Sequence, residues 1–216
     1  MVTLANLNLQ YNLALQDKAG LVEQITASTD VRDKSILSAI AEYNRRIPNL
    51  QTDLVTTITT GTYPAPSSWA AGSRFVALEY PIDNSPPTYY SPKCFRLYRK
   101  ETGLFYKMDS NPSGSFRLTY TAPHVLNGML DGYDTIPSSH EGVVGRLAAA
   151  YAALAMAAYY AQTVASNIDS VNYRTKEQEW RGVADALMKK INDELIRDEV
   201  DFQKQSEPCY YFKGWA

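Results

Sequence analysis

The residues best suited to acid–base chemistry in this chain are its two histidines. His124 ends the run TYTAPH, directly after a predicted strand, and His140 lies in the first turn of a predicted helix. Nucleophilic catalysis needs a base beside a nucleophile and a third group that orients the base. The chain has no G-x-S-x-G elbow, no phosphate-binding glycine loop and no H-E-x-x-H pair. We therefore expect a hydrogen-bonded structural His124, a solvated His140 and no catalytic residue.

Metal and carboxylate chemistry have equally little support. A four-ligand zinc site would need both histidines together with Cys94 and Cys209, and the four residues do not have finger spacing. We expect no metal and no cofactor. The neighbouring carboxylates Asp193–Glu194 and Asp198–Glu199 fall on a charged helix, which indicates a solvated face. A glycosidase-type pair stays open, because two such carboxylates need not be neighbours in sequence.

The 16 tyrosines indicate either packing or a contact surface. Packing explains the tyrosines of the predicted strands. Tyr89 and Tyr90 lie in a proline-rich loop over 81–92 and are candidate loop contacts with a partner or a sugar. The C-terminal tail over 201–216 is aromatic, and exposed aromatic residues at a chain end favour docking on a partner. We expect deletion of 208–216 to leave the monomer folded and to weaken assembly. The candidate partner-binding residues of the tail are Tyr210, Tyr211, Phe212 and Trp215.

The composition bounds the class of protein. The chain has 216 residues, 45% of them hydrophobic, which is enough for one core or for one core and a smaller lobe. Its 21 basic and 23 acidic residues give a net charge of -2, so a global basic surplus for binding phosphates is lacking, although a local basic face stays open. The N-terminus lacks the pattern of a signal peptide. The uncharged segment 147–165 is rich in alanine and tyrosine, which favours a core helix over a membrane span, and we expect no membrane partner.

The N-terminal segment alternates strictly between apolar and polar residues over LNLQYNLAL, residues 7–15. This pattern predicts a strand or an extended N-terminal arm over 1–16. Such an arm could pair with a sheet edge of its own chain or of another subunit, and the sequence favours neither.

Helical spacing dominates both ends of the remaining chain. A short helical piece is predicted over 18–25, and a clearer helix begins at Asp30 and ends before Pro48. Ser138 and Glu141 have the form of a capping box for a helix that runs to about residue 165. The last long helix is predicted over 173–198, and its apolar stripe is Trp180, Val183, Ala184, Leu187, Met188, Ile191 and Leu195.

Between these helices the chain changes to strand patterns with Pro and Gly turns. Predicted strands cover 53–60, 74–80, 94–100, 104–108 and 115–121, with a hairpin turn at 101–103 and a longer one at 109–114. The sequence therefore predicts an α+β fold, with a helical bundle over 17–48 and 136–200 and an inserted small antiparallel β-lobe over 50–125.

The order of these segments resembles the head–tail adaptor (connector) proteins of long-tailed bacteriophages. No single motif carries the resemblance, which covers roughly residues 30–200 and rests on order and spacing. The matching segments are SILSAIAEYNRRIP, SRFVALEYPID after Trp69, FRLTYTAPH, TIPSSHEGVVGRLAAAYAALAMAAYYAQ and SVNYRTKEQEWRGVADAL.

The resemblance implies a structural virion protein without enzyme activity. Such adaptors form a homo-oligomeric ring, commonly of twelve subunits, between the portal protein and the next neck or tail protein. The ring extends the channel through which DNA passes without specific binding. The protein would reside in the neck of the virion, and in the host cytoplasm during assembly. Alternatives are a stopper or tail-completion protein of the same neck and, more remotely, a carbohydrate-binding module or hydrolase that uses Tyr89 and Tyr90.

Overall fold

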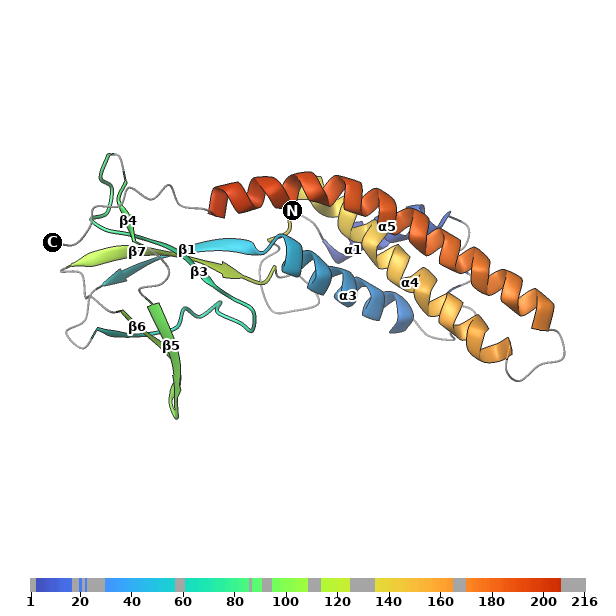
Figure 1. Ribbon diagram of the computed structural model, residues 1–216, viewed down its shortest axis with the longest axis horizontal. Helices are drawn as coiled ribbons and strands as arrows, with labels where there is room; N and C mark the ends of the chain where they lie inside the picture. The colour runs from blue at the N-terminus through green and yellow to red at the C-terminus, as the bar shows by residue number, and fades with distance from the viewer. Residues whose placement is uncertain are drawn as a thin grey trace. The chain divides into compact units, whose positions relative to one another are not determined.

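The structure, a computed structural model, describes residues 3–16, 20, 22, 30–56, 61–85, 87–90, 95–108, 114–124, 135–164 and 170–206. It confirms the predicted fold class. The described part of the chain contains four α-helices. In sequence, the strands of two small antiparallel sheets lie between the second and third of these helices, α3 and α4 (Figure 1). The chain divides into two compact units. The helical unit comprises residues 1–47 and 124–199, and the β-lobe comprises residues 48–123 and 200–216.

In the helical unit, α4 is the helix against which the others pack. Its elements are α1 (Leu4–Leu15), α3 (Asp30–Arg46), a short 3-10 helix η3 (Ser138–His140), α4 (Glu141–Val164) and α5 (Ser170–Ser206). Helix α4 contacts α1 and α3 directly, and its Tyr160 ring lies 6.0 Å from the Tyr173 ring of α5. Its buried side is made of small residues that allow this close approach: Ala148, Ala149, Ala150, Ala152, Ala153 and Ala157.

The prediction of a strand or extended arm at the N-terminus is wrong, because residues 4–15 form helix α1. The Thr3 side chain caps it by accepting a hydrogen bond from the Asn6 amide at 3.2 Å. The segment contains no β-branched residue, and its leucines and alanines favour helix. In a helix, the apolar residues of an alternating pattern form two stripes on opposite sides, because residues four apart share a face while residues two apart do not.

The other helices largely agree with the sequence. Helix α3 begins and ends as predicted, whereas α5 begins three residues before residue 173 and continues to Ser206. Of the piece predicted over 18–25, only residues 20 and 22 lie within the described part, and both are helical. The capping box is wrong: Ser138 lies inside η3, and the Glu141 carboxylate instead accepts hydrogen bonds from two side chains of α1.

The β-lobe contains two sheets around an aromatic core. The four-stranded sheet has the order β1 (Asn49–Thr56), β7 (Ser115–Ala122), β3 (Phe75–Glu79), β4 (Tyr89–Tyr90). The three-stranded sheet has the order β2 (Thr62–Pro64), β6 (Gly103–Met108), β5 (Phe95–Lys100). The short strands β2 and β4 escaped prediction because they span only three and two residues. The buried core consists of Tyr63, Leu78, Tyr106, Met108, Phe116, Leu118, Tyr120 and Ala122.

Ring contacts hold this core together. The Tyr63 ring stacks on Tyr106 at 5.2 Å and meets Phe116 edge-on at 5.3 Å. The inward residues predicted for 115–121, Phe116, Leu118 and Tyr120, are all buried. The turn at 101–103 joins β5 to β6 as predicted, whereas residues 109–113 lie outside the described part.

Helix α4 is the segment that resembles a membrane span in the sequence. The stretch Ser138–Thr163 is long and apolar enough to cross a membrane by length and composition, and 61% of its most apolar window is buried inside the protein. The buried share packs against the other helices. The rest is exposed, and it contributes to the candidate site described next.

Candidate functional site

Helix α1 exposes a second apolar stripe opposite the one that it buries. Leu7, Tyr11 and Leu15 are buried, whereas Leu9 and Leu13 are 56% and 61% exposed. The two exposed leucines are four residues apart and share one side of the helix, which we call the α1 face. A helix with apolar stripes on both sides is normally covered on both sides. Covering each leucine would contribute about 1.5–3 kcal/mol.

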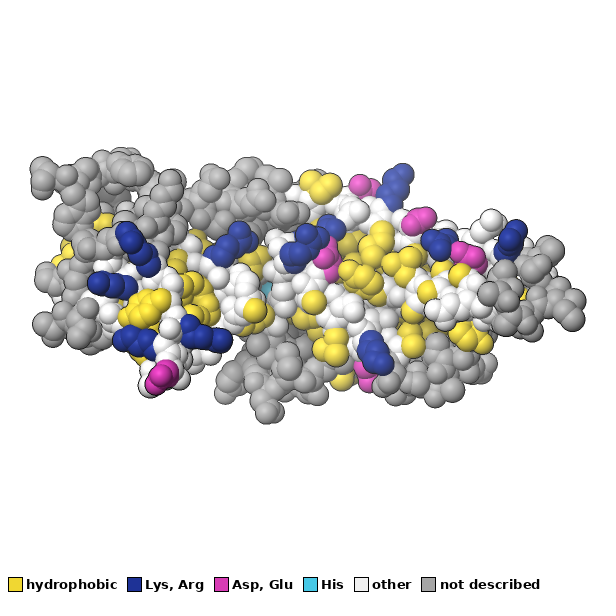
Figure 2. Space-filling model, turned by 60° about the horizontal axis from the view of Figure 1, so that its bottom comes forward, with side chains coloured by type: hydrophobic (Ala, Val, Ile, Leu, Met, Phe, Trp, Pro, Cys, Tyr) yellow, Lys and Arg dark blue, Asp and Glu magenta, His cyan; other side chains and the backbone are white. Residues whose placement is uncertain are grey.

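Helix α4 carries a second exposed apolar surface. Leu154 and Tyr159 are 39% and 41% exposed, and Ala155 and Ala158 between them are exposed as well. These four residues, the α4 face, lie along one side of the helix at spacings of four. Figure 2 shows hydrophobic side chains gathering over the helices of this unit. The α1 face and the α4 face differ in residue type and lie on different helices.

The contact between α1 and α4 fixes the α1 face on the bundle. Asn6 and Gln10 donate side-chain hydrogen bonds to the two carboxylate oxygens of Glu141, at 3.2 and 3.4 Å. Gly145 lets α1 approach closely, because a Cβ at this position would lie 3.3 Å from Gln10 Cα and 3.2 Å from its carbonyl carbon, and closer still to its Cβ. The sequence carries no signal for this contact with α1, because Gly145 and Gln10 are far apart in the chain.

Both histidines contact Tyr43, with ring centroids 5.1 Å away for His124 and 5.7 Å away for His140. His124 is buried, its backbone amide donates to Asn44 Oδ1 at 2.6 Å, and its Nε2 donates to the Ile47 carbonyl at 2.9 Å. The predicted structural role of His124 is confirmed. The prediction of a solvated His140 is wrong, because His140 is half-buried and its Nδ1 lies 2.5 Å from the Tyr43 hydroxyl oxygen.

This cluster holds the chain where it leaves and re-enters the helical unit, at Ile47 and His124. The Tyr43 side chain is completely buried, whereas His140 is partly exposed. Burial lowers the pKa of His124 from 6.5, against the raising effect of hydrogen bonds to Ile47 and Thr135, and the nearby His140 lowers it further. The hydrogen bonds of His124 tie the segment after β7 and the segment before η3 to the end of α3.

The structure describes the side chains of one of the two neighbouring carboxylate pairs of α5. Asp193 is exposed, and Glu194 forms an ion pair with Arg146 of α4. The side chains of Asp198 and Glu199 lie outside the described part. The sequence analysis did not predict an ion cluster of the β-lobe, in which Arg117 binds Glu79 at 2.6 Å and Asp83 at 2.8 Å. This cluster connects β7, β3 and the following turn, and its spacing in sequence carries no signal.

An open depression of about 410 Å³ lies beside β1 and β2 in the β-lobe. The carboxylate among its lining residues, Asp53, accepts a hydrogen bond from the Tyr120 hydroxyl at 3.0 Å. Burial, together with Tyr63 and Asp53, raises the pKa of the lining residue Tyr106. A hydrolase of the two-carboxylate type needs a second acid across the site, and the lining residues supply none.

The candidate contact tyrosines of the sequence divide between two regions. Tyr89 and Tyr90 form strand β4 rather than a free loop, and both are half-buried. Tyr90 packs on the lobe core, with its ring 6.4 Å from that of Tyr80. Tyr210, Tyr211, Phe212 and Trp215 lie outside the described residues.

Among the described residues, no group of three or more His, Cys, Asp and Glu side chains could hold a metal ion. Comparisons of the chain with models of protein families, with curated proteins and with solved structures find no match. The α1 face and the α4 face, two exposed apolar surfaces of the described residues, are the candidate site.

Proposed function

We propose that this chain is a structural subunit of the neck of a long-tailed bacteriophage. In this proposal, copies assemble into a ring, of twelve subunits by the resemblance, between the portal protein and the next neck or tail protein. The ring extends the channel for DNA, and the protein resides in the virion. The role is structural and not enzymatic.

The observation that carries the proposal is the pair of apolar faces on one helical unit. A ring of identical subunits needs two different complementary surfaces on each subunit, because every contact joins one side of a copy to the other side of the next. The α1 face offers two leucines on a surface helix. The α4 face offers Leu154 and Tyr159 together with two exposed alanines.

The near-neutral charge supports the same proposal. The net charge of -2 suits a channel through which DNA slides, because each close phosphate contact adds affinity that would slow the passage. The element order that underlies the resemblance is also the order of the fold: helix, inserted strands, then two long helices.

The test is electron microscopy of the chain mixed with the portal protein of the same genome. We expect a ring of added density on one face of the portal, whose symmetry gives the subunit number. Oligomerisation of the isolated chain is a weaker test, since such a subunit can stay monomeric until a portal templates it. Portals without added density at high protein concentration would contradict the proposal. Binding to tail tubes instead would favour the stopper or tail-completion alternative.

A pair of variants connects this test to the candidate site. Leu9→Glu with Leu13→Glu places two charges on the α1 face, and we expect a folded monomer that fails to form the ring. Leu54→Glu is the matched control, because Leu54 is 68% exposed but lies on β1 of the other unit. Ring formation by the α1 variant, or equal loss in both variants, would remove the α1 face from the proposal.

A further inference from the structure

The β-lobe carries a basic and aromatic surface that the proposed assembly does not use. In the β5–β6 hairpin, Arg96 pairs with Lys107, Tyr98 with Phe105, and Lys100 with Gly103. Partners in an antiparallel pair project from the same side of the sheet. These five side chains, Arg96, Tyr98, Lys100, Phe105 and Lys107, therefore share one side, which we call the hairpin face.

On β6 the hairpin face is the solvent side of the sheet, whereas β5 is exposed on both sides, with Leu97 45% exposed on the opposite one. The opposite side carries Tyr106 and Met108, which are 1% and 4% exposed in the lobe core. Arg96, Lys100 and Lys107 are all exposed. Figure 2 shows Lys and Arg side chains surrounding a hydrophobic patch on the lobe.

Every charged side chain among the described residues of this face is a cation. Strand β2 extends the sheet by pairing Thr62 with Lys107 and Pro64 with Phe105, so it adds no carboxylate. Within the described part of the chain, no ion pair is formed by Lys100 or Lys107. The acidic residue of the hairpin, Glu101, lies in the turn. The hairpin face therefore has a local positive potential, although the net charge of the chain is -2.

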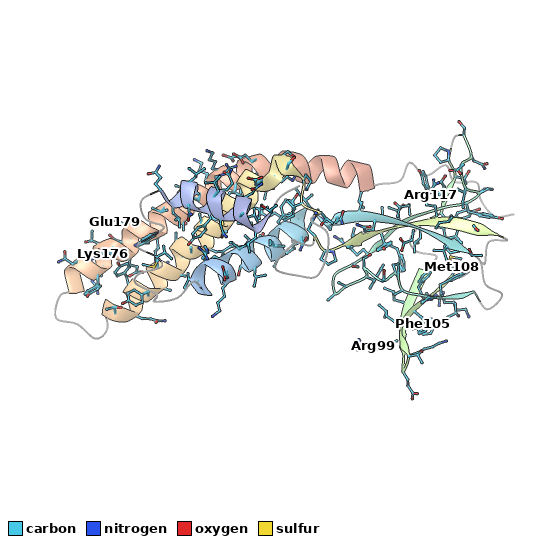
Figure 3. The ribbon with its side chains drawn as sticks, turned by 180° about the vertical axis from the view of Figure 1, so that it is seen from behind. Arg99, Phe105, Met108, Arg117, Lys176 and Glu179 are labelled. Carbon is cyan, nitrogen blue, oxygen red and sulfur yellow. The ribbon has the colours of Figure 1, made fainter. Side chains whose placement is uncertain are left out.

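Two aromatic rings lie between these cations. The Tyr98 and Phe105 rings stack with centroids 6.2 Å apart and planes inclined by 30°. The Lys100 ammonium lies 4.8 Å from the centroid of Phe105 and 5.5 Å from that of Tyr98. Figure 3 shows Phe105 on the hairpin, with Arg99 near its end.

We propose that the hairpin face binds single-stranded nucleic acid. Cations that follow a strand attract a phosphate backbone, and aromatic rings on a sheet surface stack with unpaired bases whatever their sequence. An acidic protein would use the cations but not the rings. A duplex would likewise contact the cations alone, because its bases are already stacked on one another. The inference is independent of ring assembly, which uses the helical unit.

The test is fluorescence anisotropy with the full chain and a labelled oligothymidine of about 15 nucleotides, at about 50 mM salt. We expect binding that weakens with salt and exceeds the binding of a duplex of equal length. Lys100→Gln with Lys107→Gln should weaken binding at least tenfold and reduce the slope of log K against log salt by about 1.4, since each cation contributes about 0.7 on single strands. Lys189→Gln with Lys190→Gln, two exposed lysines of α5, is the matched control and should change neither quantity.

Phe105→Leu tests the rings separately from the charges. It keeps an apolar side chain but removes the stacking surface, and we expect roughly a tenfold loss for the single strand and none for the duplex. Thermal melts of each variant report its folding, and the lysine variants decide the question if Phe105→Leu unfolds. Equal binding of duplex and single strand, displacement of the oligonucleotide by polyglutamate at matched charge, or no binding at low salt would each overturn the proposal.

Discussion

The cores of the helical unit and the β-lobe are packed with side chains of very different size. The core of the helical unit is rich in alanine, and the core of the lobe is built from Tyr63, Tyr106, Phe116 and Tyr120. Small side chains bring helix axes together, whereas large rings fill the wider space between sheets. The difference predicts that the helical unit is damaged most by added volume and the lobe most by lost volume.

The outer surfaces differ in the same way. The helical unit exposes apolar stripes, because α1 and α4 are apolar on more sides than the bundle covers. The lobe exposes cations on the solvent side of its hairpin. One chain therefore presents surfaces suited to protein on one unit and to phosphate on the other.

The largest effect is expected from removing volume in the lobe. Phe116 is fully buried, and its ring contacts Tyr63 edge-on. Phe116→Ala should lower the free energy of unfolding by about 3–5 kcal/mol, because it removes the ring and leaves a cavity. Chemical denaturation followed by tyrosine fluorescence measures this loss. A cost below about 1 kcal/mol would mean that the lobe core collapses around the cavity and that the contrast with the bundle is overstated.

Adding volume to the helical unit should have the next largest effect. Gly145→Ala places a methyl group against the Gln10 backbone of α1, and overpacking of this kind costs about 1–3 kcal/mol. Gly182→Ala on α5 is the matched control. A Cβ there meets nothing within 4 Å, so the change should stabilise the protein by about 0.4–1 kcal/mol. Two thermal melts compare them, and stabilisation by both would show that α1 can shift without cost.

The histidine cluster predicts a pH dependence of the helical unit. The pKa of His124 is lowered by burial, so the unfolded chain binds a proton more readily than the folded one. The contribution of neutral His124 to the free energy of unfolding should be fully present above about pH 6.5. It should decrease as the pH falls from there toward the lowered pKa of the folded state. Denaturation curves at a series of pH values measure this decrease. His124→Asn should flatten it, and an unchanged slope would assign the effect to another group.

Thr135→Val tests the cause of the His124 pKa. With Nε2 donating to Ile47, the neutral ring accepts at Nδ1 from the Thr135 hydroxyl, 3.1 Å away. Valine removes this donor. The Thr135 carbonyl oxygen, 3.0 Å from Nδ1, then remains as an acceptor, and an acceptor there favours the protonated ring. We expect a loss of about 1 kcal/mol at neutral pH and a raised pKa of His124. An NMR titration of the histidine C2–H signals measures the pKa, and an unchanged value would contradict the tautomer.

The smallest effect is expected for an exposed ion pair of the helical unit. Arg181 binds Glu177 one turn earlier at 2.9 Å, with the arginine side chain 59% exposed. A double-mutant cycle with Glu177→Gln and Arg181→Gln should give a coupling of about 0.3–0.5 kcal/mol that vanishes in high salt. A coupling above about 1 kcal/mol would show that surface charge contributes more to the bundle than its packing suggests.

Much of the fold could be predicted because its elements have strong local patterns. The helix at Asp30–Arg46, the long apolar helix and four of the five longer strands follow from spacing and turn residues. The sequence predicts the first strand over 53–60, whereas β1 begins four residues earlier, at Asn49. The N-terminal segment could not be read in this way. Its alternation suits a strand and also a helix with two apolar stripes, and only the lack of β-branched residues between Leu4 and Leu15 pointed to the helix.

The sequence alone determined the α+β class, the position of the inserted lobe and the hydrogen-bonded role of His124. The first two depend on local propensity, and the third on the place of His124 directly after a strand. The tertiary structure alone decided which leucines of α1 are exposed, that Tyr43 contacts both histidines, and that three cations share a face with two rings. These are long-range facts. They depend on strand register and on the order in which helices cover one another, and neither is encoded in the neighbours of a residue along the chain.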